Sequence, residues 1–277
     1  MAVWKKLNPE TGKYEKIPGA SISGGGSESG ESTGGTTVAV PDLKGKTILF
    51  MGDSYTVGMS AMLKSMAIEF NAVDDNRGVV GSAIRGTYDT APYPMWIRTD
   101  LACEEYVSNG NTDTVGAIVF MGGANDSFSP QSLGGGINET DKNTIYGAMH
   151  SLMNKFRNTF PDAPIFVILQ PSTWSQSVAS ITTDEAAQIK GFDDLAQLQG
   201  FDDYQYSVFA TYKKETIVEE VARFYGCHII DCCFDWHSAL SSSDRARYWS
   251  SDKTHLTTVG YQDVANKLRT KMIEVLA

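Results

Sequence analysis

The sequence predicts an α/β fold in which a parallel sheet lies between two layers of helices. Short, near-continuous apolar runs, typical of strands buried on both faces, occur at residues 46–51, 77–81, 115–121, 164–170 and 227–231. Helical segments alternate with these runs, and right-handed crossovers then place helices on both faces of the sheet. We therefore expect a three-layer α/β/α sandwich with five parallel strands.

The expected helices cover residues 55–70, 143–159, 204–225 and 259–275. The clearest is 143–159, because its apolar residues recur at helical spacing from Ile145 to Phe156 and Pro161 follows its end. Residues 126–142 and 172–203 are irregular in pattern and are expected to be loops. The second loop is long enough to cover or line a site.

Composition limits the classes of protein to consider. The 277 residues suffice for one sizeable core with a small appendage. The formal net charge of −10 argues against nucleic acid or an anionic membrane as a partner. No apolar stretch is long enough for a transmembrane helix, and we see no secretory signal peptide. The four cysteines form no Cys-x-x-Cys motif, so we expect reduced thiols without a catalytic thiolate.

The chain divides into three parts by composition. Residues 1–18 place a turn-forming Asn-Pro-Glu-Thr-Gly segment between two short apolar stretches, which indicates a small hairpin or tail. Residues 19–40 are rich in Gly, Ser and Thr, as flexible linkers are. Residues 41–277 form the globular domain. The short N-terminal part is either a tether that docks on a partner or a plain tail.

Ser54 stands at the turn from the first expected strand to the first expected helix. Loops at the carboxyl edge of a parallel sheet are where open α/β folds bind ligands. The N–H of Ser54 falls in the first turn of the helix, where it is unpaired by backbone and favours negative charge. Gly52-Asp53-Ser54 is therefore a candidate nucleophile turn, although glycine and serine also occur in ordinary turns.

Two further strand ends are expected to lie beside Ser54. They carry Gly81 and Asn125, whose loops leave the same edge of the sheet. The N–H groups of Ser54 and Gly81 and the side-chain amide of Asn125 would then form a three-donor oxyanion hole. Glycine at position 81 permits close approach of a ligand to the backbone.

A serine nucleophile needs a base, and the chain offers four histidines. We expect His150 on the polar face of a helix and His228 in a buried strand, whereas His237 in a loop stays open. His255 follows Asp252 at a spacing that lets the carboxylate accept from Nδ1 and leaves Nε2 free. Taken alone, Asp-x-x-His is also the pattern of a loop cap or of half a metal site.

These residues resemble the four sequence blocks of the SGNH (GDSL-type) hydrolases. The blocks are Gly52-Asp53-Ser54, Gly81 at the end of 76–81, Gly123-Ala124-Asn125-Asp126, and Asp252-x-x-His255, in the family's order. The resemblance spans residues 46–277. It implies a flavodoxin-like sandwich with five parallel strands and an esterase activity, and it implies neither a cofactor nor a metal ion.

The resemblance also implies a role for each residue. Ser54 would be the nucleophile, His255 the general base and Asp252 the group that orients His255. Ser54, Gly81 and Asn125 would form the oxyanion hole. The chain departs from the usual family pattern at Tyr55 and Lys253, which we expect to shape the substrate entrance.

Other classes of protein fit the sequence less well. The nucleophile elbow of α/β-hydrolases needs glycine where this chain has Thr56, and no Gly-Lys-Ser/Thr follows a strand as in a P-loop. A metal hydrolase built on Asp53, Asp252 and His255 lacks a further ligand at ordinary spacing. A non-catalytic carbohydrate-binding module is disfavoured because the serine, histidine and aspartate are all present.

The substrate prediction rests on aromatic residues. Tyr55, Trp174, Trp236, Tyr248 and Trp249 are expected to line the site, where aromatic rings can stack on sugars. No broad apolar surface for a lipid chain is evident, so we expect short acyl groups, acetyl first, on an O-acylated carbohydrate or another small ester. The alternatives are a lipase or lysophospholipase and a hydrolase directed at teichoic acid.

The N-terminal part adds an expectation about location. Residues 1–18 with their linker weakly resemble attachment segments of phage or prophage tail and baseplate proteins. The resemblance implies that this part attaches the enzyme to a phage particle or mediates homo-oligomerisation. We accordingly expect the protein in a phage or prophage virion or in the bacterial cytoplasm.

Overall fold

The computed structural model describes residues 5–7, 14–16, 40–127, 130–171, 203–232, 247–252 and 254–277. The chain divides into two compact units, Met1–Val38 and Ala39–Ala277. In the first unit, β1 (Lys5–Leu7) and β2 (Tyr14–Lys16) pair antiparallel, with Leu7 opposite Tyr14. Residues 17–39 lie outside the described part of the chain, so the linker at 19–40 stays a prediction.

The second unit is built on one parallel sheet of five strands. The strands are β3 (Thr47–Gly52), β4 (Val73–Gly78), β5 (Val115–Met121), β6 (Ile165–Leu169) and β7 (His228–Asp231). Their order across the sheet is β4-β3-β5-β6-β7, and every neighbouring pair is parallel. The predicted five-stranded parallel sheet is confirmed.

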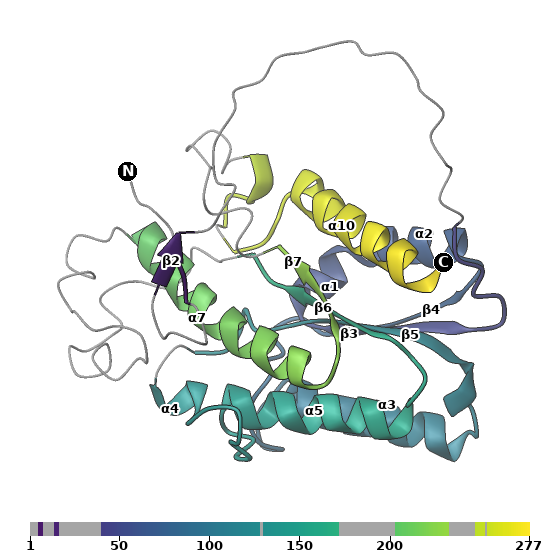
Figure 1. The fold of residues 1–277 in the computed structure, drawn as a ribbon, viewed down its shortest axis with the longest axis horizontal. Coiled ribbons are helices and arrows are strands. Elements are labelled where there is room, and N and C mark those ends of the chain that lie inside the picture. Colours follow the sequence, from purple (N-terminus) through teal and green to yellow (C-terminus); the bar gives the residue numbers. More distant parts are fainter. Residues whose placement is uncertain are drawn as a thin grey trace, which may run out of the picture. The chain divides into compact units, whose positions relative to one another are not determined.

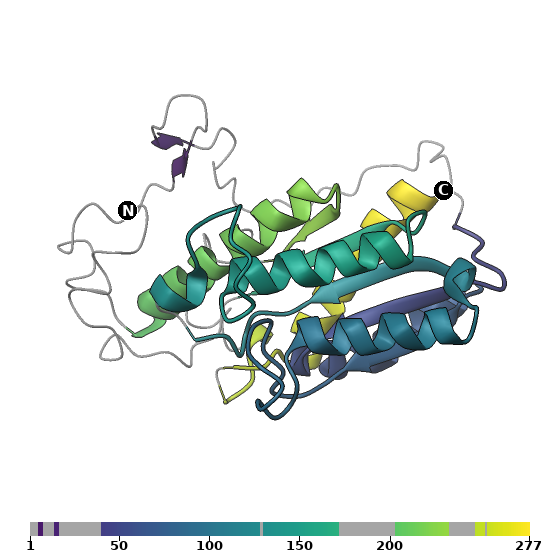
Figure 2. The ribbon, with the colours of Figure 1, turned by 90° about the horizontal axis from the view of Figure 1, so that it is seen from below.

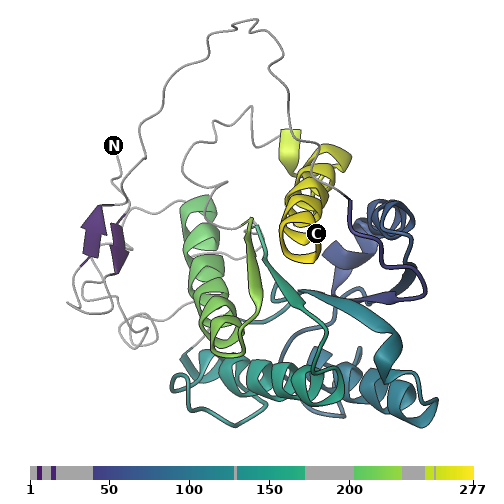
Figure 3. The same cartoon turned by 45° about the vertical axis from the view of Figure 1, so that its right-hand side comes forward.

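Helices cover both faces of this sheet (Figure 1). In the described part of the chain the helices include α1 (Ser54–Gly58), α2 (Ser60–Glu69), α3 (Met95–Ser108), α4 (Pro130–Leu133), α5 (Ile145–Thr159), α7 (Asp203–Phe224) and α10 (Thr258–Leu276), and a 3₁₀ turn covers Thr112–Thr114. Figure 2 shows α3, α5 and α7 side by side on one face, and Figure 3 shows α10 on the opposite face. The three-layer prediction is therefore confirmed. None of the described helices has the length and apolar character needed to cross a bilayer.

Three details differ from the sequence prediction. The strand expected at 77–81 is instead β4, which covers Val73–Gly78. It lies at the edge of the sheet, where the polar residues 74–77 are tolerated, and the two valines that follow it belong to the loop after the strand. The helix expected at 55–70 is two helices, α1 and α2, separated at Met59. Helix α3, which follows Pro94, was not predicted.

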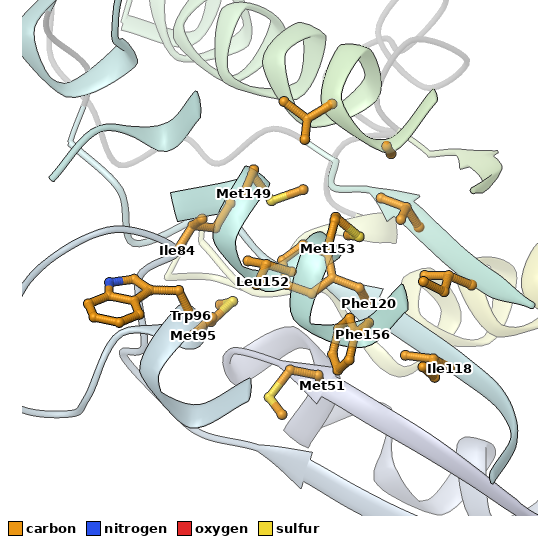
Figure 4. Close-up of a cluster of buried hydrophobic side chains, with 14 of the residues drawn as sticks. Met51, Ile84, Met95, Trp96, Ile118, Phe120, Met149, Leu152, Met153 and Phe156 are labelled. Carbon is orange, nitrogen blue, oxygen red and sulfur yellow. The ribbon is translucent and has the colours of Figure 1, made fainter. Parts of the chain in front are cut away.

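The buried apolar side chains of the described residues form two clusters, one on each face of the sheet. On one face, the predicted stripe of α5 is confirmed, since Leu152 and Phe156 are fully buried. Figure 4 shows these side chains gathered over Met51 and Phe120 of the strands. On the other face, α10 and α2 cover Phe50. Burial on both faces explains why the inner strands are near-continuous apolar runs.

Three strands end level with one another where the site lies. Gly52 at the end of β3 is in register with Gly78 of β4 and with Met121 of β5. A side chain at position 52 would have its Cβ 2.1 Å from Thr56 Oγ1 and 2.2 Å from the Met121 carbonyl oxygen, so only glycine fits this turn. The loops carrying Ser54, Gly81 and Asn125 accordingly leave the same edge of the sheet.

Candidate active site

The turn that presents Ser54 is fixed by the residue before it. Asp53 has extended backbone angles, and its Oδ1 accepts a hydrogen bond of 2.9 Å from the Tyr55 N–H, which caps the start of α1. Ser54 is the first residue of that helix and is 8% exposed. The tight glycine turn and the aspartate cap together aim the serine out of the sheet edge.

A hydrogen-bonded chain joins Ser54 to two residues about 200 positions later. Ser54 Oγ lies 3.0 Å from His255 Nε2, and His255 Nδ1 lies 2.7 Å from Asp252 Oδ2. Because a carboxylate only accepts hydrogen bonds, Nδ1 carries the proton and Nε2 is free to accept from the serine hydroxyl. The geometry is that of a nucleophile, a base and an orienting carboxylate.

The loop that carries Asp252 and His255 is folded around the aspartate. Asp252 Oδ1 accepts hydrogen bonds of 2.9 Å from the N–H groups of Thr254 and His255 and another from the Ser250 hydroxyl. Burial would raise the pKa of Asp252, but the hydrogen bonds from Ser250, His255 and Thr254 outweigh it and hold the pKa well below its usual range. The carboxylate facing His255 is therefore ionised.

Tyr55 does not line the site. It is fully buried, and its hydroxyl donates to the carbonyl oxygen of Thr254, the residue before His255. The Tyr55 and His255 rings have centroids 6.1 Å apart. The prediction that Tyr55 contacts substrate is wrong, because the side chain is buried and its hydroxyl supports the histidine loop instead.

The other predicted aromatic contacts have different outcomes. Trp249 is only 6% exposed and belongs to the core, and its backbone bridges to Leu256, so the prediction that it contacts substrate is wrong. Tyr248 is half-buried beside Arg247, and its role stays a prediction. The remaining predicted positions, Trp174, Trp236, His237 and Lys253, lie outside the described residues.

The loops of the predicted oxyanion donors are joined to each other. Gly81 has φ +79° in the turn after β4, a conformation that favours glycine. Asn125 is exposed, and its Nδ2 donates a hydrogen bond of 3.0 Å to the carbonyl oxygen of Ser82, the residue after Gly81. The buried Asp126 carboxylate accepts from the N–H of Ile84 at 2.8 Å. Among the described residues Asn125 Nδ2 makes the one hydrogen bond to Ser82, so its second N–H is available to a ligand.

The family assignment follows from comparison with known proteins. The model of the GDSL-like lipase/acylhydrolase family matches residues 50–262, about three quarters of the chain. The chain belongs to this family. The resemblance to SGNH (GDSL-type) hydrolases is thereby confirmed, and this GDSL-like protein is an ester-hydrolysing enzyme.

Solved structures share its fold at low identity. A protein from Lactobacillus plantarum is 20% identical with a TM-score of 0.55, over 83% of this chain and 97% of its own. Est24, a carbohydrate acetylesterase from Sinorhizobium meliloti, is 11% identical with a TM-score of 0.51, over 83% and 99%. At such identities the likeness shows the fold alone. A search of curated proteins gave no match.

Arg98 is a residue of this GDSL-like hydrolase that the sequence did not single out. It lies on α3, and its Nη1 donates a hydrogen bond of 3.1 Å to the carbonyl oxygen of Gly52 and one of 3.3 Å to Ser82 Oγ. Its Nη2 donates to the carbonyl oxygen of Arg77. The guanidinium therefore connects the nucleophile turn with the loop of Gly81. The missed helix α3 explains why this contact was not anticipated.

The described residues bear on two other chemistries. Cys103 and Cys227 form no disulfide, and burial raises the pKa of both thiols to about 11, so neither is a thiolate near neutral pH. Within the ranges that the structure describes, no group of three or more histidine, cysteine or carboxylate side chains is arranged to hold a metal ion.

Proposed function

We propose that this GDSL-like hydrolase is a serine esterase that removes short acyl groups, with acetyl as the preferred group, from a carbohydrate. The observation that carries the proposal is the unbroken chain of hydrogen bonds from Ser54 Oγ through His255 to Asp252. A hydroxyl, an imidazole and an ionised carboxylate in this order are the minimal set for acyl transfer through a serine.

In the proposed mechanism, Ser54 Oγ attacks the ester carbonyl carbon while His255 Nε2 takes the hydroxyl proton. The resulting oxyanion accepts from the N–H groups of Ser54 and Gly81 and from Asn125 Nδ2. The C–O bond to the alcohol breaks, and His255 protonates the leaving alkoxide. Water then attacks the acyl-enzyme, giving its proton to His255, and collapse of the second intermediate releases the acid and returns the proton to Ser54.

We expect Asn125→Ala to lower kcat by about 10²–10³-fold with little change in KM, because one oxyanion donor is lost. The measurement is steady-state hydrolysis of p-nitrophenyl acetate. Asn154→Ala, at an exposed position of α5, is the matched control and should keep full activity. A loss of less than threefold at Asn125 would remove it from the proposed oxyanion hole.

Exposed aromatic rings support a carbohydrate substrate. Tyr88 is 61% exposed and Tyr93 is 49% exposed, and their rings meet edge to face with centroids 6.4 Å apart. The Tyr93 carbonyl accepts 2.9 Å from the hydroxyl of Ser82, next to Gly81. Flat aromatic faces pack on the C–H faces of sugars, and Est24, which shares the fold, is a carbohydrate acetylesterase. Tyr88 and Tyr93 therefore offer exposed ring surface for a sugar, which the buried Trp249 does not.

The proposal is tested by acyl-chain length and by carrier. We expect kcat/KM to be at least tenfold higher for p-nitrophenyl acetate than for the octanoate, and acetate to be released from acetylated xylan, an acetylated glycan. Ser54→Ala protein supplies the background rate for each substrate. Preference for the octanoate would favour the lipase or lysophospholipase alternative instead.

A further inference from the structure

Helix α7 carries two adjacent charged residues inside the core. Lys214 and Glu215 are 1% and 0% exposed. They fall on the same side of the helix as Ile217 and Val218, which pack into the apolar cluster. Burial of a charge without compensating contacts is strongly unfavourable, so charged residues persist in a core only where hydrogen bonds or opposite charges compensate.

Lys214 binds the backbone of the loop that carries Asn125. Its Nζ donates hydrogen bonds of 3.0 Å to the carbonyl oxygens of Gly123 and Asp126. These two carbonyls flank Asn125 on either side. The ammonium group therefore fixes both ends of the short segment that presents the Asn125 amide to the edge of the sheet.

Glu215 reaches the nucleophile turn through one intermediary. Its Oε2 accepts a hydrogen bond of 2.9 Å from the N–H of Gln170, the residue after β6. The side chain of Gln170 in turn donates a hydrogen bond of 2.8 Å from Nε2 to Asp53 Oδ2. The other oxygen of Asp53 caps the helix that begins at Ser54. Asp53, Gln170 and Glu215 are all at most 1% exposed, so water does not compete for these bonds.

The loop backbone lies close against this pair. Gly123 has φ +131°, and a Cβ there would lie 3.0 Å from Glu215 Oε1. That oxygen has no hydrogen-bond partner among the described residues. Burial raises the pKa of Glu215 well above its usual value and that of Asp53 to about 6, against the hydrogen bonds that each accepts. Glu215 therefore lies close to the Gly123 backbone while its Oε2 binds the N–H of Gln170.

We infer that Lys214 and Glu215 are positioning residues that hold the Asn125 amide and Ser54 in one catalytic arrangement. The inference rests on the proposed function, since it assigns Asn125 to the oxyanion hole. Each residue acts through another: Lys214 through the carbonyls around Asn125, and Glu215 through Gln170 and Asp53. Because a misplacement of about 1 Å can reduce a rate about 10²-fold, their loss should act on kcat.

The test is a double-mutant cycle between Lys214→Met and Asn125→Ala, read as kcat and KM for p-nitrophenyl acetate. Lys214→Met alone should lower kcat by about 10²-fold with KM within about twofold. In the Asn125→Ala background it should cost less than about threefold, because the group it positions is gone. Arg223→Met, which removes an exposed cation from the same helix, is the control and should keep full activity.

Equal losses in both backgrounds, or no loss in the wild-type background, would overturn the assignment of Lys214. If Lys214→Met fails to fold, Glu215 gives a second test. Glu215→Leu leaves the Gln170 N–H unpaired and should lower kcat strongly, whereas Glu215→Gln keeps an acceptor and should lose far less. Equal loss in these two variants would overturn the assignment of Glu215. Turnover by Ser54→Ala would instead refute the proposed function itself.

Discussion

Replacing Ser54 by alanine is expected to lower kcat by about 10⁶-fold, as removal of the serine of a catalytic triad does. The substitution removes the oxygen that lies 3.0 Å from His255 Nε2 and leaves no group to form the acyl-enzyme. The fold should be unaffected, because alanine suits the first position of a helix and the Asp53 cap binds the N–H of Tyr55 rather than the serine side chain. KM should change little.

The measurement is burst and steady-state hydrolysis of p-nitrophenyl acetate, with Ser60→Ala as the matched control. Ser60 is exposed at the start of α2, so its loss removes a hydroxyl from the same region without touching the histidine. Labelling with a fluorophosphonate probe should modify wild-type Ser54 and leave the Ser54→Ala protein unlabelled. A loss in kcat below about tenfold, or a label on another residue, would show that Ser54 is not the nucleophile.

The edge of the sheet at which the candidate residues lie could be predicted from simple periodicity, although β4 ends at Gly78 rather than at Gly81. Apolar runs identify strands, parallel strands end at one edge, and loops from that edge converge. This reasoning placed Ser54, Gly81 and Asn125 at one edge of the sheet, and the structure adds the contact of His255 with Ser54. The contact of a residue near position 54 with one near 255 depends on topology, which the resemblance to a known family supplied.

What the sequence did not reveal depends on side-chain direction and burial. Tyr55 and Trp249 are aromatic residues beside catalytic positions, and only the three-dimensional structure shows that their rings point into the core. Lys214 and Glu215 did carry a signal, since they share a helix face with Ile217 and Val218. Charged residues on an apolar helix face are a reason to expect a buried polar network.

Asp252→Asn should lower kcat by about 10⁴-fold, the size of the effect when a triad carboxylate is replaced by an amide. The reason lies in the two different tasks of the carboxylate oxygens. Oδ1 accepts from the N–H groups of Thr254 and His255, and an asparagine oxygen can keep these bonds. The amide nitrogen then replaces Oδ2 opposite His255 Nδ1.

An amide nitrogen donates where Oδ2 accepts, so His255 Nδ1 must become the acceptor and the ring proton moves to Nε2. With Nε2 protonated, the imidazole cannot take the proton of Ser54. Because the pKa of wild-type Asp252 is held below its usual range, its carboxylate stays ionised to more acidic pH than an ordinary aspartate. Protonation of Asp252 therefore does not limit wild-type activity near neutral pH. The defect of Asp252→Asn relative to wild type should accordingly persist throughout pH 6–8.

The kcat of Asp252→Asn should be compared with that of Asp162→Asn, an exposed aspartate just before β6 at the opposite edge of the sheet. Both changes remove one negative charge, but only the first reverses the hydrogen bond to His255. Hydrogen bonds that Oδ1 accepts from the loop backbone should preserve the thermal stability of Asp252→Asn, and Asp162→Asn changes only an exposed side chain. Near-equal activities would mean that Asp252 shapes its loop without orienting the base, and the proton of Ser54 would need another route to His255.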